Sequence, residues 1–165
     1  MIPFNRKSLL LALAITGSTG AIFGAMPPAP LLVRAGHWEM ALQNAARNGN
    51  IAVIANILDN GRVEVDAIYG DYRCTALHCA AAGGKLGSVN QLIQYNADLD
   101  IQDAEGATAL ILAAMNHEIG IVKRLLEAGA NTAVVDATGK TALDYANEDN
   151  HMELIQCLDG AAAAG

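Results

Sequence analysis

Histidine and glutamate residues offer the first candidates for chemistry in this chain of 165 residues. His117 and Glu118 begin like the His-Glu-x-x-His helix of zinc proteases, but Ile121 stands where the second zinc ligand is required. The histidines lie far apart in the sequence, at His37, His78, His117 and His151. Because zinc ligands normally come in closely spaced pairs, we expect no metal ion and no cofactor.

Nucleophilic catalysis and phosphate binding have no recognisable motif either. The chain lacks a G-x-S-x-G sequence, and Gly17-Ser-Thr-Gly20 lies in an apolar N-terminal segment. It also lacks the G-x-x-x-x-G-K-[S/T] loop that binds phosphates. We therefore predict no catalytic residues and a protein that is not an enzyme.

Four carboxylates fall within one short polar stretch, at Asp98, Asp100, Asp103 and Glu105. Weak calcium binding is one interpretation of this cluster. However, neither the glycine nor the terminal glutamate of a calcium-binding loop is correctly placed. Solvated loop carboxylates are the favoured interpretation.

Three cysteines are present, at Cys74, Cys79 and Cys157. Cys74 and Cys79 flank a predicted helix start, where a disulfide between them would have awkward geometry. We favour small buried side chains for Cys79 and Cys157.

Composition and charge point to a helical, acidic body. Hydrophobic residues make up 53% of the chain but aromatic residues only 4%, which favours closely packed helices over a β-sandwich or barrel. Residues 1–38 hold three of the ten basic residues and none of the 17 acidic ones, so residues 39–165 carry a net charge of −10. Such a body repels a phosphate backbone, and we expect no nucleic-acid binding.

Residues 1–25 have the pattern of an export signal. Arg6 and Lys7 precede an apolar run that starts at Ser8, and small residues follow. Cleavage after Ala21 or after Ala25 would fit this pattern. Residues 26–36 contain three prolines and are predicted to form a linker.

An uncleaved membrane anchor is the alternative interpretation. Residues 8–26 are barely long enough to span a bilayer, which needs about 20 apolar residues. Gly20 and Gly24 form a weak G-x-x-x-G helix-packing pattern. Both interpretations export the acidic body.

A repeat organises the rest of the chain. Thr75-Ala-Leu-His78, Thr108-Ala-Leu-Ile111 and Thr141-Ala-Leu-Asp144 recur at spacings of 33 residues. A weaker copy, Met40-Ala-Leu-Gln43, lies 35 residues before Thr75. Each threonine suits a helix N-cap, and the alanines that follow allow close helix packing. Gly49, Gly83-Gly84 and Asn150 are predicted to stop the first helix of a unit, where a left-handed residue suits the C-terminal cap, and Gly61, Asn96 or Gly129 is predicted to end the second.

These units resemble ankyrin repeats. The family pattern D-x-x-G-x-T-P-L-H is matched by Asp103-Ala-Glu-Gly-Ala-Thr-Ala-Leu110 and by Asp136-Ala-Thr-Gly-Lys-Thr-Ala-Leu143, and Leu125-Leu-Glu-Ala-Gly-Ala-Asn131 resembles the end of the second helix. The resemblance implies an all-α solenoid of stacked helix-turn-helix units with hairpin-like finger loops. It covers residues 37–160, in units of about 37–70, 71–103, 104–136 and 137–160, and leaves a tail at 161–165.

Several positions depart from the family pattern. The proline of T-P-L-H is absent from every unit, and only His78 keeps the histidine, which the resemblance implies hydrogen-bonds its own turn. His117 replaces the glycine that normally ends the first helix. The first unit lacks the threonine cap, and the fourth stops without a finger, as expected of capping repeats.

The candidate binding residues lie on the predicted fingers and inner helices. Tyr69, Tyr72 and Arg73 fall in the longest finger, and such side chains often anchor protein interfaces. Covering of the first unit by these tyrosines is an equally good interpretation. The family's binding geometry adds Ala104, Glu105, Met115, Asn116, Thr138, Lys140, Glu148 and Asp149.

The resemblance and the N-terminal pattern together define the expected function. We expect an exported, non-catalytic module that binds another protein through its concave finger and inner-helix face. The periplasm of a Gram-negative bacterium, with a chaperone-like or inhibitor role, is the favoured setting; secretion and inner-membrane anchoring are the alternatives. The alternative function is a membrane-anchored structural adaptor. The partner and the oligomeric state are left open.

Overall fold

A computed structural model describes residues 36–162 of the chain, and these residues form an all-α repeat structure. Within this range the only strand-like pairing is one isolated bridge between Tyr69 and Cys74. The predicted all-α fold is confirmed. The helices are α1 (His37–Asn48), α2 (Ile51–Asp59), α3 (Ala76–Ala82), α4 (Leu86–Gln94), α5 (Ala109–Met115), α6 (Ile119–Glu127), α7 (Ala142–Glu148) and α8 (Met152–Ala162).

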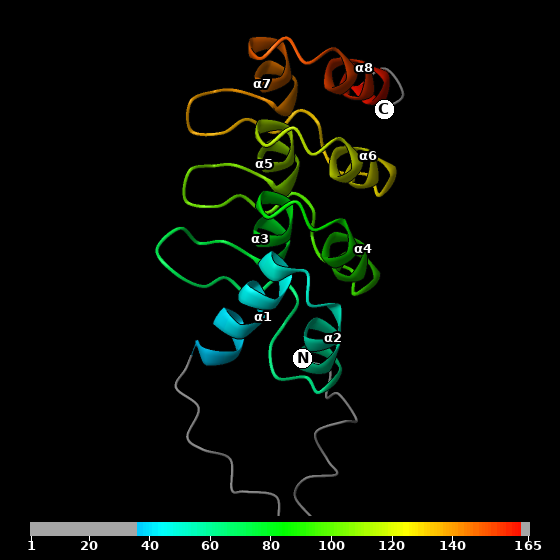
Figure 1. Ribbon diagram of the computed structural model, residues 1–165. Coiled ribbons are helices and arrows are strands. Elements are labelled where there is room, and N and C mark those ends of the chain that lie inside the picture. Colours follow the sequence, from blue (N-terminus) through cyan, green and yellow to red (C-terminus); the bar gives the residue numbers. More distant parts are fainter. Residues whose placement is uncertain (1–35, 163–165) are drawn as a thin grey trace, which may run out of the picture. The chain divides into compact units, whose positions relative to one another are not determined.

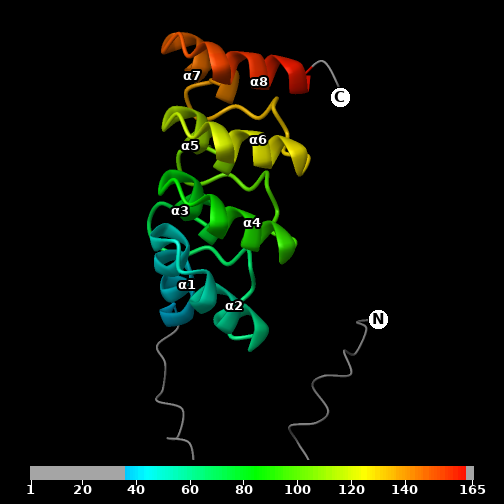
Figure 2. The same ribbon diagram turned by 45° about the vertical axis from the view of Figure 1, so that its right-hand side comes forward.

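The helices form two layers of antiparallel pairs. Helices α1, α3, α5 and α7 stack in sequence order as an inner layer, and α2, α4, α6 and α8 stack beside them as an outer layer (Figures 1 and 2). The three loops that lead from one pair to the next project beyond the inner layer (Figure 1). We call these loops finger 1 (residues 60–75), finger 2 (95–108) and finger 3 (128–141).

Threonine side chains start the short inner helices, as predicted. Thr75, Thr108 and Thr141 have extended backbones, and each hydroxyl accepts a hydrogen bond from the N–H three residues later. This bond satisfies one of the free donors in the first turn. Helix α1 starts instead at Gly36, which offers no side-chain cap, and it is longer than the other inner helices.

The turns between inner and outer helices contain left-handed residues at the predicted Gly49 and Asn150, at Gly84 of the predicted Gly83-Gly84 pair, and at His117, for which no left-handed conformation was predicted. Gly83 itself is right-handed. Gly49, Gly84, His117 and Asn150 have φ values of 78°, 66°, 58° and 52°. The residue just before each of the outer helices α4, α6 and α8 lies against the left-handed residue in the turn of the preceding repeat. Lys85 lies against Gly49, and Glu118 against Gly84. At the third step His151 stacks on His117, with ring centroids 5.1 Å apart.

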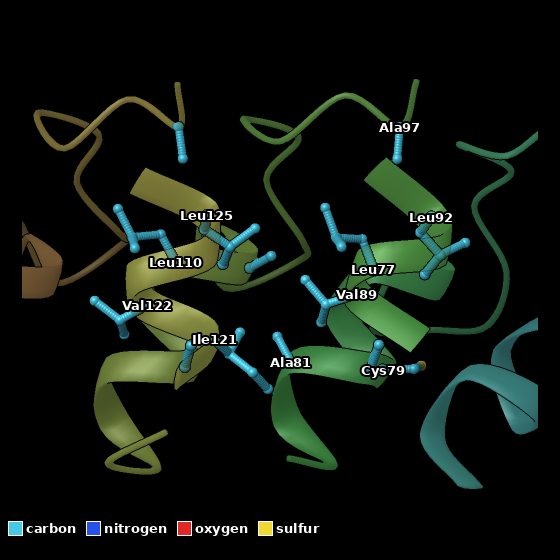
Figure 3. Close-up of a cluster of buried hydrophobic side chains, with 14 of the residues drawn as sticks. Leu77, Cys79, Ala81, Val89, Leu92, Ala97, Leu110, Ile121, Val122 and Leu125 are labelled. Carbon is cyan, nitrogen blue, oxygen red and sulfur yellow. The ribbon is translucent and has the colours of Figure 1, made fainter. Parts of the chain in front are cut away.

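The core is built from alanine and branched aliphatic side chains, and no aromatic side chain is among its buried residues within 36–162. Leu77, Leu110 and Leu125 lie between successive helix pairs (Figure 3), and each buried leucine stabilises the fold by about 2 kcal/mol. Small residues let the inner helices approach closely. A Cβ atom at Gly83 would lie 2.8 Å from the backbone oxygen of Arg47.

The predicted signal or anchor (1–25), and the linker up to residue 35, lie outside the described residues. No helix within 36–162 is long and apolar enough to cross a bilayer. At the other end α8 continues to Ala162, beyond the predicted end of the fourth unit at residue 160. The unit boundaries themselves stay predictions.

Candidate partner-binding face

Main-chain hydrogen bonds join the three fingers into one surface. The N–H of Ala104 donates to the carbonyl oxygen of Tyr72, and the N–H of Ala137 donates to that of Glu105, both at 2.9 Å. The finger tips are therefore fixed relative to one another and can present their side chains as a set.

An aspartate folds finger 2 and finger 3 from within. Asp103 accepts the N–H groups of Glu105 and Ala107 on one carboxylate oxygen, both at 2.9 Å. Asp136 does the same in finger 3 and also accepts the Tyr145 hydroxyl at 2.5 Å. Hydrogen bonds from Tyr145 and then Thr138 hold the pKa of Asp136 well below its ordinary value. These carboxylates are turn-forming groups.

Finger 1 is held from outside instead. Gly70 occupies the place of the folding aspartate, and the amide nitrogen of Gln43 on α1 donates to the carbonyl oxygen of Cys74 at 2.5 Å. Tyr69 donates its backbone N–H to the same oxygen at 3.2 Å. Its ring lies so close to Gly36 that a Cβ atom there would be 2.5 Å from Cε2 of Tyr69.

The two tyrosines of finger 1 therefore have different surroundings. Tyr69 is 37% exposed and covers the start of α1, whereas Tyr72 is 70% exposed at the finger tip. Arg73 follows it with φ of 51°, a left-handed conformation that is uncommon for a residue with a side chain. The two interpretations from sequence, covering of the first unit and partner binding, therefore apply to different residues. The geometry of Tyr69 fits covering, and that of Tyr72 leaves it available for contact.

The other predicted residues lie at finger tips and at the ends of inner helices. Met115 is 43% exposed at the end of α5. Lys140 and Glu148 form an ion pair at 2.7 Å, and Asp149 lies 3.6 Å from Nε2 of His117. We call the resulting surface the finger face, and it consists of Tyr72, Arg73, Ala104, Glu105, Met115, Asn116, Thr138, Lys140, Glu148 and Asp149.

We add Arg47 to the finger face, although it is not among the residues predicted from sequence. It is exposed at the end of α1, in the repeat position that Met115 and Glu148 occupy in later units. Arg47 is related to Met115 by the repeat spacing, which is 35 residues from the first unit to the second and 33 from the second to the third. This spacing is the sequence signal that identifies Arg47. The missing threonine cap of that unit makes the register hard to assign.

The acidic stretch of finger 2 gives its carboxylates to backbone groups. Asp98 accepts the N–H of Asp100 at 3.0 Å, and Asp100 accepts the N–H of Asn131 in finger 3 at 2.8 Å. With Asp103 also engaged, only Glu105 has no such role. Among residues 36–162 no cluster of three potential ligands is arranged to hold a metal ion.

His78 joins two repeats through a buried ring that is 2% exposed. Its Nδ1 accepts the backbone N–H of Thr75 at 3.1 Å, and its Nε2 lies 3.1 Å from the carbonyl oxygen of Ala107 in finger 2. The implied bond within its own turn is therefore present, together with a second bond across repeats. Burial lowers the pKa of His78, and the hydrogen bond to Ala107 opposes this in part.

The three cysteines are free thiols, so Cys74 and Cys79 do not pair in this structure. Cys79 is buried as predicted, whereas Cys157 is only partly buried, because its helix α8 has no further unit beyond it within the described residues. Burial raises the pKa of the Cys74 thiol to about 11 and also raises that of Cys79. Both thiols stay protonated and weakly nucleophilic at neutral pH.

Comparisons with known proteins agree with the helix pairs and fingers. A family model described as ankyrin repeats (3 copies) matches residues 27–103 and 80–161. Ankyrin repeat domain-containing protein 29 of Danio rerio is 41% identical over 58 residues, which are 35% of this chain and 19% of that protein. Palmitoyltransferase ZDHHC17 of Rattus norvegicus is 36% identical over 72 residues, which are 44% of this chain and 10% of that protein.

The chain thus corresponds to a small part of these relatives, and the resemblance lies in the repeats. The family model matches well over half of the sequence, and the eight helices of residues 36–162 follow the same repeat. This chain belongs to the ankyrin-repeat family.

Proposed function

We propose that this chain is a non-catalytic protein-protein interaction module that binds a partner protein through its finger face. Ankyrin repeats generally act as such modules, and the fingers are joined by main-chain bonds into one surface. The observation that carries the proposal is the exposed row of Tyr72, Glu105 and Thr138 at corresponding places on three linked fingers. The palmitoyltransferase activity named for one relative is not proposed here, because the match covers 10% of that protein.

Site-directed photocrosslinking in the source cells tests this proposal. A photoreactive amino acid is introduced at Met115 on the finger face, and separately at Gln94, an exposed residue of the outer helix α4. We expect a crosslinked partner from Met115 and none from Gln94. Crosslinks from Gln94 alone would reject the finger face as the binding surface.

We further propose that the repeats act outside the cytoplasm, with a chaperone-like or inhibitor role toward a periplasmic enzyme or toxin. The support is the basic, apolar and small-residue sequence of residues 1–25. The alternative is a structural adaptor held by an uncleaved anchor. N-terminal mass spectrometry separates them, since a mature chain that begins near residue 22 or 26 supports export with cleavage. An intact start in the membrane fraction supports the anchor.

A further inference from the structure

Finger 1 carries an arginine in a backbone conformation that the other fingers give to glycine. Arg73 has φ of 51°, and Gly106 and Gly139, one and two repeats later, have φ of 77° and 80°. The left-handed region is unfavourable for a residue with a Cβ atom. Residues in such conformations cluster at functional sites. The presence of arginine instead of glycine at this position therefore requires an explanation from the contacts of its side chain.

No contact within the described part of the chain provides that explanation. The Arg73 guanidinium forms no hydrogen bond or ion pair with any residue in 36–162, although its backbone N–H donates to Gly70. Tyr72 beside it is 70% exposed, and its carbonyl oxygen is held by Ala104 of finger 2. A fixed finger tip thus presents an aromatic ring and an unpaired cation together.

A second arginine lies on the neighbouring helix. Arg47 contacts the sulfur of Cys79 through Nη2 at 3.7 Å and has no carboxylate partner among the described residues. Gln43, one turn earlier on α1, donates to the carbonyl oxygen of Cys74, the residue after Arg73. Residues four apart share a helix face, so Arg47 lies on the side of α1 that meets finger 1.

Positive charge on the finger face is concentrated at this end. The repeat position of Arg47 holds Met115 and then Glu148 in later units, and the tip position of Tyr72 holds Glu105 in finger 2. Lys140 at the far end is already paired with Glu148. Two exposed carboxylates lie at this end, Asp71 in finger 1 and Glu105 in finger 2, whose neighbour Ala104 bonds to Tyr72. The rest of the face is acidic or neutral, and the whole chain has a formal net charge of −7.

We propose that Arg73 and Arg47, with the ring of Tyr72, bind an acidic segment of the partner protein. This inference rests on the proposed function, because it assigns a chemistry to one end of the finger face. Arginine binds carboxylates through paired N–H donors. The acidic far end repels the same segment, so the charge pattern sets the direction in which the partner lies across the fingers.

Crosslinking followed by charge reversal tests the inference on the full-length chain. A photocrosslinker at Tyr72 captures the partner in the source cells, and mass spectrometry identifies the crosslinked partner peptide. We expect that peptide to contain Asp or Glu residues. With the identified partner purified, Arg73→Glu should weaken binding by about tenfold or more, and Arg73→Lys by less. Reversal of a partner carboxylate to arginine should restore binding to Arg73→Glu.

The matched control is Lys123→Glu, an equal charge reversal on the outer helix α6, where Lys123 forms only an exposed ion pair with Glu153. It should change affinity by less than about twofold. A crosslinked peptide without carboxylates, or unchanged binding by Arg73→Glu, overturns the inference. Crosslinks from Met115 but not Tyr72 also overturn it while the proposed function stands, and crosslinks from Gln94 alone reject both.

Discussion

Acidification should destabilise the repeats through the single residue His78. A backbone N–H can only donate and a carbonyl can only accept, so the contacts of the ring with Thr75 and Ala107 define its protonation. Nδ1 must be unprotonated and Nε2 must carry the hydrogen. A second proton, on Nδ1, would remove the acceptor of the Thr75 N–H and so break that half of the capping box of α3.

The magnitude follows from linkage between protonation and folding. Burial lowers the pKa of His78 in the folded chain, while the unfolded chain keeps the ordinary value of about 6.5. Between these two pKa values the unfolded state binds a proton that the folded state does not. The contribution of the neutral His78 ring to the free energy of unfolding is therefore fully present above about pH 6.5. Below that pH it falls by up to about 1.4 kcal/mol per pH unit. This slope holds only over the pH range in which the buried ring of the folded chain stays neutral.

Urea denaturation followed by circular dichroism, at a series of values between about pH 7 and about pH 5, measures this loss. His78→Gln is the matched variant, because its amide supplies one acceptor and one donor without titrating. We expect the variant to lose less stability than the wild type over this range, by at most about 1.4 kcal/mol per pH unit. Equal pH dependence in the two proteins would show that the assigned protonation of His78 is wrong.

Four further substitutions, the last of them a control, test other parts of the structure by the same denaturation assay. Arg73→Gly should raise the free energy of unfolding by about 0.5–1 kcal/mol, because relief of the left-handed strain exceeds the entropy that glycine adds to the unfolded chain; lower stability would contradict the strain. Ser88→Ala should add about 1 kcal/mol, since the buried Ser88 hydroxyl has no hydrogen-bond partner in the structure, and a destabilised variant would reveal a partner. Gly83→Ala should cost about 2–3 kcal/mol by collision with the α1 backbone. Gly129 has open space around it but a φ of 91°, so Gly129→Ala should cost only about 1 kcal/mol. A larger cost for Gly129→Ala than for Gly83→Ala would refute the close approach of Gly83 to the α1 backbone.

Local features of the repeat could be predicted from sequence because they depend on neighbours in the chain. The threonine caps and the left-handed Asn150 depend on hydrogen bonds and backbone angles within a few residues. Tyr69 could not be assigned in this way, because its position depends on Gly36, which is distant in the sequence. The same holds for His117, whose unusual conformation is accompanied by stacking against His151 of the next repeat. A pattern of spacing contains no information about which side chains meet across repeats.

Finger 1 breaks two local rules that fingers 2 and 3 follow. It has Gly70 where they have a folding aspartate, and Arg73 where they have glycine. A loop with both changes would be a poor hairpin by itself, and the structure compensates through Gln43 and through the packing of Tyr69 on α1. Because the fold of this finger is maintained from its base, its tip is free to carry side chains that contribute nothing to folding. Departures from local consistency that are compensated elsewhere are expected at functional sites. This division between a supported base and an unpaired tip is the physical reason to place partner recognition at Tyr72 and Arg73.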